Sequence, residues 1–412
     1  MHALPKTLPL VAWSLLLPAL AWGQTGLYLG QPYGAPAALD TPSTLQMPSP
    51  PALPAHYGTE APEVGEGVTQ SVVPAQPAQE GMDSAIAEPG WDCIGTCVPR
   101  CNRWWFQVGG LVMARDYNDD VWLSYDALNP SVGLLSTPDI EDNYQGGVEA
   151  TFGYRFGHQW WLLATYWTLE PMNVVSLVQD PGGQISTALD FRSLSIGGTP
   201  VNDWYDNALA HKANLRSEFH NVELNLFHDS FQLSPCWPVY MSYLVGARWF
   251  QFSEDFLYAS ADTSTTFGTD PANEVYLDID VSNNLIGAQV GCMLQYYPSC
   301  RWSVFVAPRV GIYSNQITMK YRIYSGDGQT GLDIRSNKGD FATLAQLDVG
   351  TAYYLTPSLS LYLGYRLVSV SGVALTTDQM PRLLDDLNAI RQVDANGHLF
   401  LHGAFAGLTW TF

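Results

Sequence analysis

The chain has 412 residues, of which only 14% are charged and 13% are aromatic, and its formal net charge is −21. With 18 basic residues against 39 acidic ones, it lacks the surplus of Lys and Arg that phosphate neutralisation needs, so we expect no binding to nucleic acid. An excess of large amphipathic rings favours a surface that meets lipid headgroups, although a carbohydrate-binding protein could be equally aromatic.

The first 23 residues are arranged like a secretory signal peptide. A basic residue, Lys6, lies in a short polar start, residues 8–20 are apolar, and small residues allow cleavage after Ala21 or Gly23. This apolar run is short and contains two prolines, and no other unbroken apolar stretch reaches about 18 residues. A helical membrane protein is therefore excluded, and we expect an exported protein.

Residues 24–90 are rich in Pro, Ala, Gln, Gly and Glu and have few aromatic residues. Such a composition buries too little apolar surface to offset chain entropy, so it predicts a disordered periplasmic tail. Residues 91–103 form a Cys-rich segment before a change of pattern at residue 104.

From residue 104 to residue 412, short segments alternate between apolar and polar or small residues. In residues 359–367, for example, Leu359, Leu361 and Leu363 alternate with Ser360, Tyr362 and Gly364. A period of two defines a sheet with two unlike faces. The pattern predicts about ten strands, which lie near residues 104–115, 146–156, 160–169, 214–229, 239–252, 281–297, 301–313, 342–355, 359–370 and 398–412.

Short and long connections alternate between these strands. The links at 157–159, 234–238, 298–300 and 356–358 are short, whereas those at 116–145, 170–213, 253–280, 314–341 and 371–397 are long and polar. All long loops then lie at one end, which is the arrangement of an outer-membrane barrel and has no reason to arise in a sandwich. We therefore predict an all-β fold over residues 104–412. It is a closed antiparallel transmembrane β-barrel of about ten strands (range about 8 to 14), with short periplasmic turns and long extracellular loops.

The last strand ends with apolar residues on one face, Leu408, Trp410 and Phe412. A terminal Phe after alternating apolar residues resembles the signal that barrel assembly machinery reads. We therefore expect that machinery and outer-membrane lipid as partners, and leave the oligomeric state open.

Several stretches resemble one family of bacterial proteins. Residues 104–116 and 121–125 are similar to the first strand and first loop of the putative beta-barrel porin-7 family, which is typical of planctomycetes. The strand end at 154–156 and the terminal residues 409–412 are similar too. The resemblance covers residues 104–412 and implies an outer-membrane location and a porin-like protein, without a defined substrate.

Six charged residues are predicted to share one depth inside the barrel. Three acids lie on descending strands and three arginines on ascending strands, all at similar distances from their turns, and each residue rises about 3.3 Å along its strand. Buried charges persist mainly when they are paired. We expect a charged belt that plugs or narrows the lumen, or, as the alternative, separate charges that meet lumen water. The six residues are Glu149, Glu223, Asp348, Arg248, Arg309 and Arg366.

The six cysteines are expected near the periplasmic end, where disulfides persist. They are Cys93, Cys97, Cys101, Cys236, Cys292 and Cys300. We predict disulfides that tie the segment before the barrel to the turns, with a connectivity that spacing does not disclose. A metal site is the rival interpretation, but the spacing lacks the close pairs of zinc sites, so we expect neither metal nor cofactor.

Three functions remain open. The first is a porin-like narrow channel for small solutes or a structural surface protein, since ten strands enclose at most a narrow path. The alternative is a non-conducting scaffold or receptor whose acidic loops bind a ligand or cations. The third is an outer-membrane hydrolase that uses His211 with Asp203 or Asp206 near a rim. No catalytic arrangement can be assigned from spacing, so we expect no enzyme.

Overall fold

The structure is a computed structural model that describes residues 103–116, 121–140, 144–156, 159–191, 194–234, 237–380 and 387–412. The predicted signal peptide and tail, and the Cys-rich segment up to residue 102, lie outside these residues. None of the helices in the described ranges is long and apolar enough to cross a membrane.

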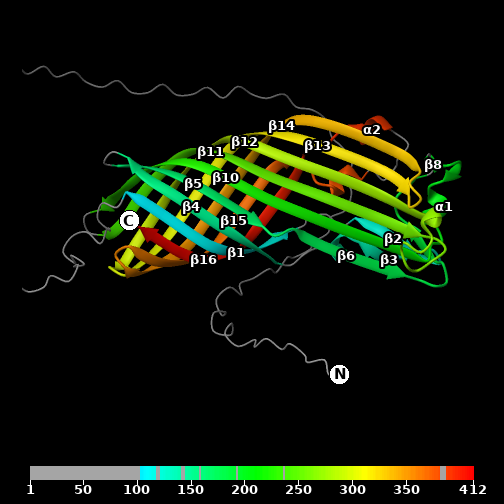
Figure 1. The fold of residues 1–412 in the computed structure, drawn as a ribbon, viewed down its shortest axis with the longest axis horizontal. Coiled ribbons are helices and arrows are strands. Elements are labelled where there is room, and N and C mark those ends of the chain that lie inside the picture. The colour runs from blue at the N-terminus through cyan, green and yellow to red at the C-terminus, as the bar shows by residue number, and fades with distance from the viewer. Residues whose placement is uncertain are drawn as a thin grey trace, which may run out of the picture. The chain divides into compact units, whose positions relative to one another are not determined.

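Ten antiparallel strands form a closed barrel, as predicted (Figure 1). The sheet runs β11-β12-β13-β14-β15-β16-β1-β4-β5-β10 and closes because β10 also pairs with β11. The ten strands are β1 (Trp104–Asp116), β4 (Gln145–Phe156), β5 (Trp160–Leu169), β10 (Ala210–Ser234), β11 (Trp237–Ala261), β12 (Glu274–Ser299), β13 (Trp302–Ser325), β14 (Thr330–Thr356), β15 (Leu359–Val373) and β16 (Gly397–Thr411).

One end of the barrel, which we call the turn end, carries the short links. They connect β4 to β5, β10 to β11, β12 to β13 and β14 to β15. The two ends of the sheet meet here too, since the Trp104 N–H donates to the Phe412 carbonyl at 2.9 Å and the Phe412 N–H donates back at 3.0 Å. Both ends of the barrel wall therefore lie at the turn end, as an even strand number requires.

The opposite end, the loop end, carries the smaller elements. The strand β6 (Met172–Gln179) continues the wall of β5 and pairs with the far half of β10. The strands β2, β3 and β7 form a separate three-stranded sheet, and β8 and β9 pair with each other. The remaining bounds are β2 (Trp122–Asp126), β3 (Asn129–Ser136), η1 (Thr137–Ile140), β7 (Ile185–Thr187), β8 (Ser195–Ile196), β9 (Thr199–Pro200), α1 (Asn202–Tyr205), η2 (Pro271–Asn273), η3 (Thr377–Gln379) and α2 (Leu387–Arg391).

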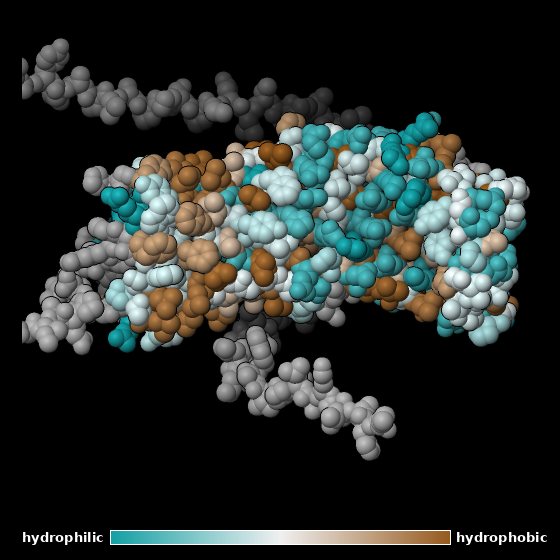
Figure 2. Space-filling model, viewed as in Figure 1, coloured by the Kyte–Doolittle hydropathy of each residue, from teal (hydrophilic) through white to brown (hydrophobic). Residues whose placement is uncertain are grey.

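The half of the barrel next to the turn end, which we call the lipid-facing half, has an apolar outer face. On β13, the exposed outward side chains run from Trp302 through Val304 and Val310 to Ile312. Ten steps of about 3.3 Å on a strand tilted by about 40° rise about 25 Å, the height of the apolar band of a transmembrane barrel. Figure 2 shows this band as brown side chains over the left half of the molecule.

In the other half, which we call the loop half, the inner face of the barrel wall is apolar and the outer face is polar. On β13, Ile317, Met319 and Ile323 point inward and are fully buried, whereas Thr318 and Lys320 point outward. In Figure 2 the outer surface of this half is mostly teal. The loop half is thus built like a water-soluble barrel with an apolar core.

This reversal of the apolar face corrects two predicted loops. Residues 253–280 and 314–341 were expected to be long connections, but β11 continues to Ala261, β12 begins at Glu274, and the link between β13 and β14 is only residues 326–329. The polar residues that suggested loops lie on the outward faces of strands that extend beyond the lipid-facing half. The alternation continues across the boundary, but its apolar phase moves from the outside to the inside.

Candidate functional site

Six charged side chains from six strands meet inside the barrel as one network of ion pairs. The Arg366 guanidinium donates to both carboxylate oxygens of Asp348, at 2.8 and 3.1 Å, and to Glu149 Oε2 at 2.5 Å. Arg309 connects the two sides, with Nη1 3.3 Å from Glu223 Oε2 and Nη2 3.4 Å from Asp348 Oδ2. Arg248 Nη1 lies 3.7 Å from Glu223 Oε1. We call these six residues the charged network.

The strand register brings the partners together. Glu223 on β10 lies directly opposite Arg248 on β11, and Asp348 on β14 lies directly opposite Arg366 on β15. Such direct cross-strand pairs have Cβ atoms only about 5 Å apart. The structure thus places together all six charges that were predicted from their distances to the turns.

Four amide side chains complete the network and were not singled out from the sequence. Gln289 Nε2 donates to Glu223 Oε2 at 2.8 Å, Gln346 Nε2 donates to both oxygens of Asp348 at 3.0 Å, and Asn221 and Asn225 donate to Glu223. A sequence signal existed for three of these amides, because Asn221, Asn225 and Gln346 lie two residues from a charged network residue and therefore on the same inward face of the strand.

Most side chains of the network are shielded from solvent. The side chains of Glu223 and Arg248 are fully buried, and only Arg309 keeps substantial exposure, at 19%. Removing one partner from such a buried set leaves an uncompensated charge, which is far more costly than losing an exposed ion pair.

Next to the network, on its loop side, a ring of large side chains fills the barrel. Nine of the ten barrel strands contribute one inward residue each, and none of these residues is more than 1% exposed. A continuous water path would expose at least one of them, so the lumen is closed at this level. This apolar collar consists of Met113, Trp167, Phe219, Phe252, Leu285, Tyr313, Leu344, Val370 and Leu401.

The link between β15 and β16 enters the lumen above the collar. Its residues 372–380, the lumen segment, are held by side chains of the wall: Asn283 exchanges two hydrogen bonds with Ala374, at 2.8 and 2.9 Å, and Glu254 accepts the Thr376 N–H at 2.7 Å. Glu254 also binds Arg115. The segment turns inward at Gly372, whose φ of +83° suits glycine.

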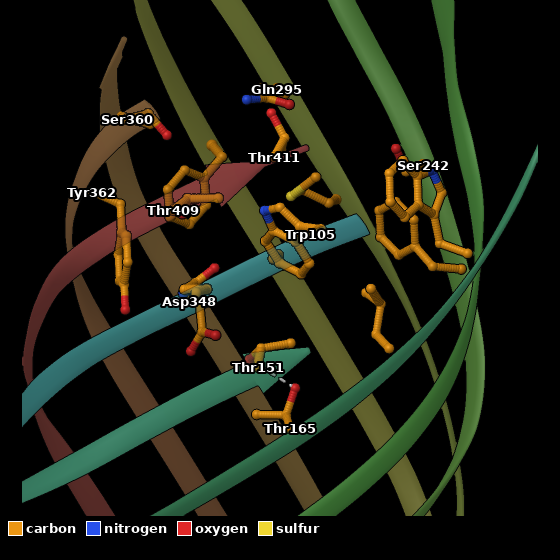
Figure 3. Close-up of a pocket in the computed structure, with 18 of the residues that line it drawn as sticks. Trp105, Thr151, Thr165, Ser242, Gln295, Asp348, Ser360, Tyr362, Thr409 and Thr411 are labelled. Atoms are coloured by element: carbon orange, nitrogen blue, oxygen red, sulfur yellow. Dashed lines mark hydrogen bonds between the residues drawn. The ribbon is translucent and has the colours of Figure 1, made fainter. Parts of the chain in front are cut away.

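On the other side of the network, the lumen widens into a cavity of about 590 Å³. Side chains from the strand ends, among them Trp105, Thr409 and Thr411, point into this space together with Asp348 of the network (Figure 3). The turn residues Pro357 and Ser358 also line it, which places its mouth at the turn end. We call this space the turn-end pocket.

His211, a candidate base for the hydrolase interpretation, lies in the core of the loop half. Its Nδ1 is 2.7 Å from Ser124 Oγ and 2.9 Å from the Tyr258 hydroxyl, and all three residues are fully buried. Burial lowers the pKa of His211 to about 3. Asp203 is exposed, and burial raises the pKa of the half-buried Asp206 carboxyl. The Ser124–His211 pair therefore has no surface that a substrate could reach.

The predicted disulfides stay a prediction. Cys93, Cys97, Cys101 and Cys236 lie outside the described residues, and Cys292 is a free thiol that is not joined to Cys300.

The residues proposed as an assembly signal lie at the turn end. Leu408, Trp410 and Phe412 are all exposed on the outward side of the last strand. Their exposure suits a segment that is recognised by another protein, but their role stays a prediction.

Several solved structures are similar to this chain in outline. The chain is similar to the outer membrane protease OmpT from Escherichia coli at 14% identity, over 76% of this chain and 97% of that one, with a TM-score of 0.40. The translocator domain of the autotransporter NalP from Neisseria meningitidis shares 10% identity, over 78% and 90%, with a TM-score of 0.32. The toluene transporter TbuX from Ralstonia pickettii shares 12%, over 76% and 91%, with a TM-score of 0.28. These likenesses are too distant to bear on function.

The family comparison is more direct. No curated protein matches the chain. A family model described as putative beta barrel porin-7 matches residues 213–397, a narrower range than the 104–412 expected from the resemblance. The match begins on β10 and ends at the start of β16, so it includes five of the six residues of the charged network. This part of the barrel is therefore similar to the putative beta barrel porin-7 family.

Proposed function

We propose that this protein is a closed outer-membrane barrel that conducts no solutes and acts as a rigid scaffold or receptor. The apolar collar carries this proposal, because its nine side chains come from the barrel wall itself and are buried. The charged network below it adds a second closed layer. An apolar constriction also resists wetting, which raises the barrier to ions further.

The outer-membrane location rests on the apolar band of the lipid-facing half and on the family name. We propose that the exposed residues Leu408, Trp410 and Phe412 serve as the assembly signal and that the loop half stands outside the bilayer. A polar outer face over an apolar core keeps such a half folded in water and leaves its surface available to a ligand.

A gated porin is the second candidate, and the lumen segment favours it. Asn283 and Asn315 donate hydrogen bonds to this segment and Glu254 accepts one from it, so its withdrawal would widen the loop half. Withdrawal would not move the collar, whose residues belong to strands. The closed scaffold therefore agrees better with the geometry.

Conductance across planar bilayers tests the proposal. The wild-type protein is expected to give no discrete current steps, and the variant Phe219→Ala/Phe252→Ala, which removes a stacked pair with ring centres 5.1 Å apart from the collar, is expected to leak. The matched control is Phe106→Ala/Phe152→Ala, since these rings are also a cross-strand pair but point to lipid. Regular steps from the wild-type protein would contradict a closed lumen.

A further inference from the structure

The turn-end pocket is large enough for a small molecule and is closed at its inner end. Its volume of about 590 Å³ lies within the range of ligand sites, about 300–1,000 Å³. The charged network forms its inner wall, through Glu149, Arg309, Asp348 and Arg366. A molecule that enters at the turn end must therefore leave by the same mouth, which is the geometry of a binding site rather than of a passage.

The walls of the pocket combine two chemistries. One group of lining side chains is aromatic or aliphatic and offers a large apolar contact: Trp105, Trp161, Leu163, Phe227, Leu244, Met293, Phe305 and Phe405. A second group offers hydroxyls and amides, including Thr151, Thr165, Ser242 and Gln295, which Figure 3 shows around the same space. Such a mixture suits an amphipathic molecule better than a sugar or an inorganic ion.

Arg309 gives the inner end its charge preference. Of the six network residues it is the most exposed, with 19% of its side chain accessible, and its ion-pair contacts are long at 3.3 and 3.4 Å. Arg366, by contrast, uses three donors on Asp348 and Glu149. The lining residues include three arginines, with Arg155, against two carboxylates. An incoming anion would therefore find a partly exposed guanidinium that the carboxylates of the protein hold only by long contacts.

We propose that the turn-end pocket binds one amphipathic monoanion, an alkyl or aryl carboxylate, with its charged group at Arg309 and its apolar part among the aromatic residues. In the proposed orientation the mouth faces the periplasm, so the ligand would be taken from that side. This inference does not depend on the proposed function, because the pocket can bind whether or not the lumen conducts.

Binding of decanoate to the full chain in lipid nanodiscs tests this proposal, measured by equilibrium dialysis against empty nanodiscs. Decanol and decyltrimethylammonium, which share the chain length but not the charge, serve as ligand controls. Arg309→Gln removes the proposed donor while Arg248 still faces Glu223 and Arg366 still faces Asp348. Thr409→Trp fills the mouth of the pocket, and Ala406→Trp on the lipid-facing side of the same strand is its matched control.

We expect saturable binding of about one decanoate per barrel, reduced about tenfold or more, a loss of about 1.4 kcal/mol, by Arg309→Gln and by Thr409→Trp but unchanged in Ala406→Trp. Decanol and the cation are expected to bind at least about tenfold more weakly than decanoate. Uptake equal to that of empty nanodiscs, equal binding by the Thr409 and Ala406 variants, or equal binding of the cation would each overturn the proposal. If Arg309→Gln fails to fold, the comparison of the two Trp variants still decides.

Discussion

Replacement of Arg366 by Met should destabilise the barrel strongly, because it breaks the charged network from one side. Arg366 donates three hydrogen bonds, at 2.5, 2.8 and 3.1 Å, to two carboxylates that are no more than 5% exposed. Asp348 would keep Arg309 at 3.4 Å, but Arg366 is the cationic partner shown for Glu149. Loss of one partner of a buried pair costs about 3–5 kcal/mol, and we expect a fall of that size in the free energy of unfolding.

Urea unfolding of the protein in lipid vesicles, followed by tryptophan fluorescence, measures this change. The exposed pair of Arg216 and Glu218, with side chains 51% and 39% exposed, provides the control. Arg216→Met should cost less than about 1 kcal/mol. The neutral variant Glu149→Gln/Asp348→Asn/Arg366→Met should recover most of the loss, since no charge is left buried alone. If Arg366→Met and Arg216→Met lower the free energy of unfolding by the same amount, the network is exposed to water and the interpretation of a closed lumen is wrong.

Two further predictions concern the loop half. Burial lowers the pKa of His211 to about 3, so the folded protein favours the neutral imidazole. The free energy of unfolding should therefore be highest above about pH 6.5, the pKa of His in the unfolded chain. It should fall by roughly 1.4 kcal/mol per pH unit as the pH is lowered towards about pH 3. His211→Gln should therefore flatten the pH dependence of the urea midpoint over that window, and an unchanged profile would contradict the buried neutral ring. Asn283→Ala should speed amide hydrogen exchange in the lumen segment, because it removes both hydrogen bonds to Ala374. Asn284→Ala, at the next and partly exposed position, should leave that exchange unchanged, and equal rates in the two variants would show that Asn283 does not hold the segment.

Strand number and order could be predicted because the lipid-facing half has a simple pattern. Residues such as Leu361, Leu363 and Tyr365 face lipid in a strict alternation, and the short turns end each strand clearly. The charged network could be anticipated for the same reason: its members lie at similar distances from those turns, and the register of neighbouring strands then brings Glu223 opposite Arg248.

The length of the strands could not be predicted from an apolar outer face alone. Beyond Ile312 on β13 the outward residues become polar, which also describes a loop. The signal that could have separated the two is the continued alternation with Ile317, Met319 and Tyr321, all buried, in the inward phase. Strands persist there because an apolar interior replaces lipid as the place where apolar side chains are buried.

The contacts that close the lumen depend on tertiary structure. The pairing of Asn283 with Ala374 joins residues 91 positions apart. Likewise, Glu254 binds Thr376 over 122 positions. Neither pair has a spacing that secondary structure could reveal, so the lumen segment had to be expected as an ordinary external loop.

The closed lumen depends on one feature of the barrel wall: its apolar face is the outer one in the lipid-facing half and the inner one in the loop half. Spin labels along β13 test this feature most directly. In a cysteine-free background, single labels at Val310, Ile312, Gln316 and Thr318 all replace outward residues of one strand. In nanodiscs, labels at the first two positions should be relaxed more by oxygen than by a water-soluble nickel chelate, and labels at the last two should show the reverse. If all four respond as lipid-buried positions, the apolar band has no boundary after Ile312 and the two-part barrel is contradicted.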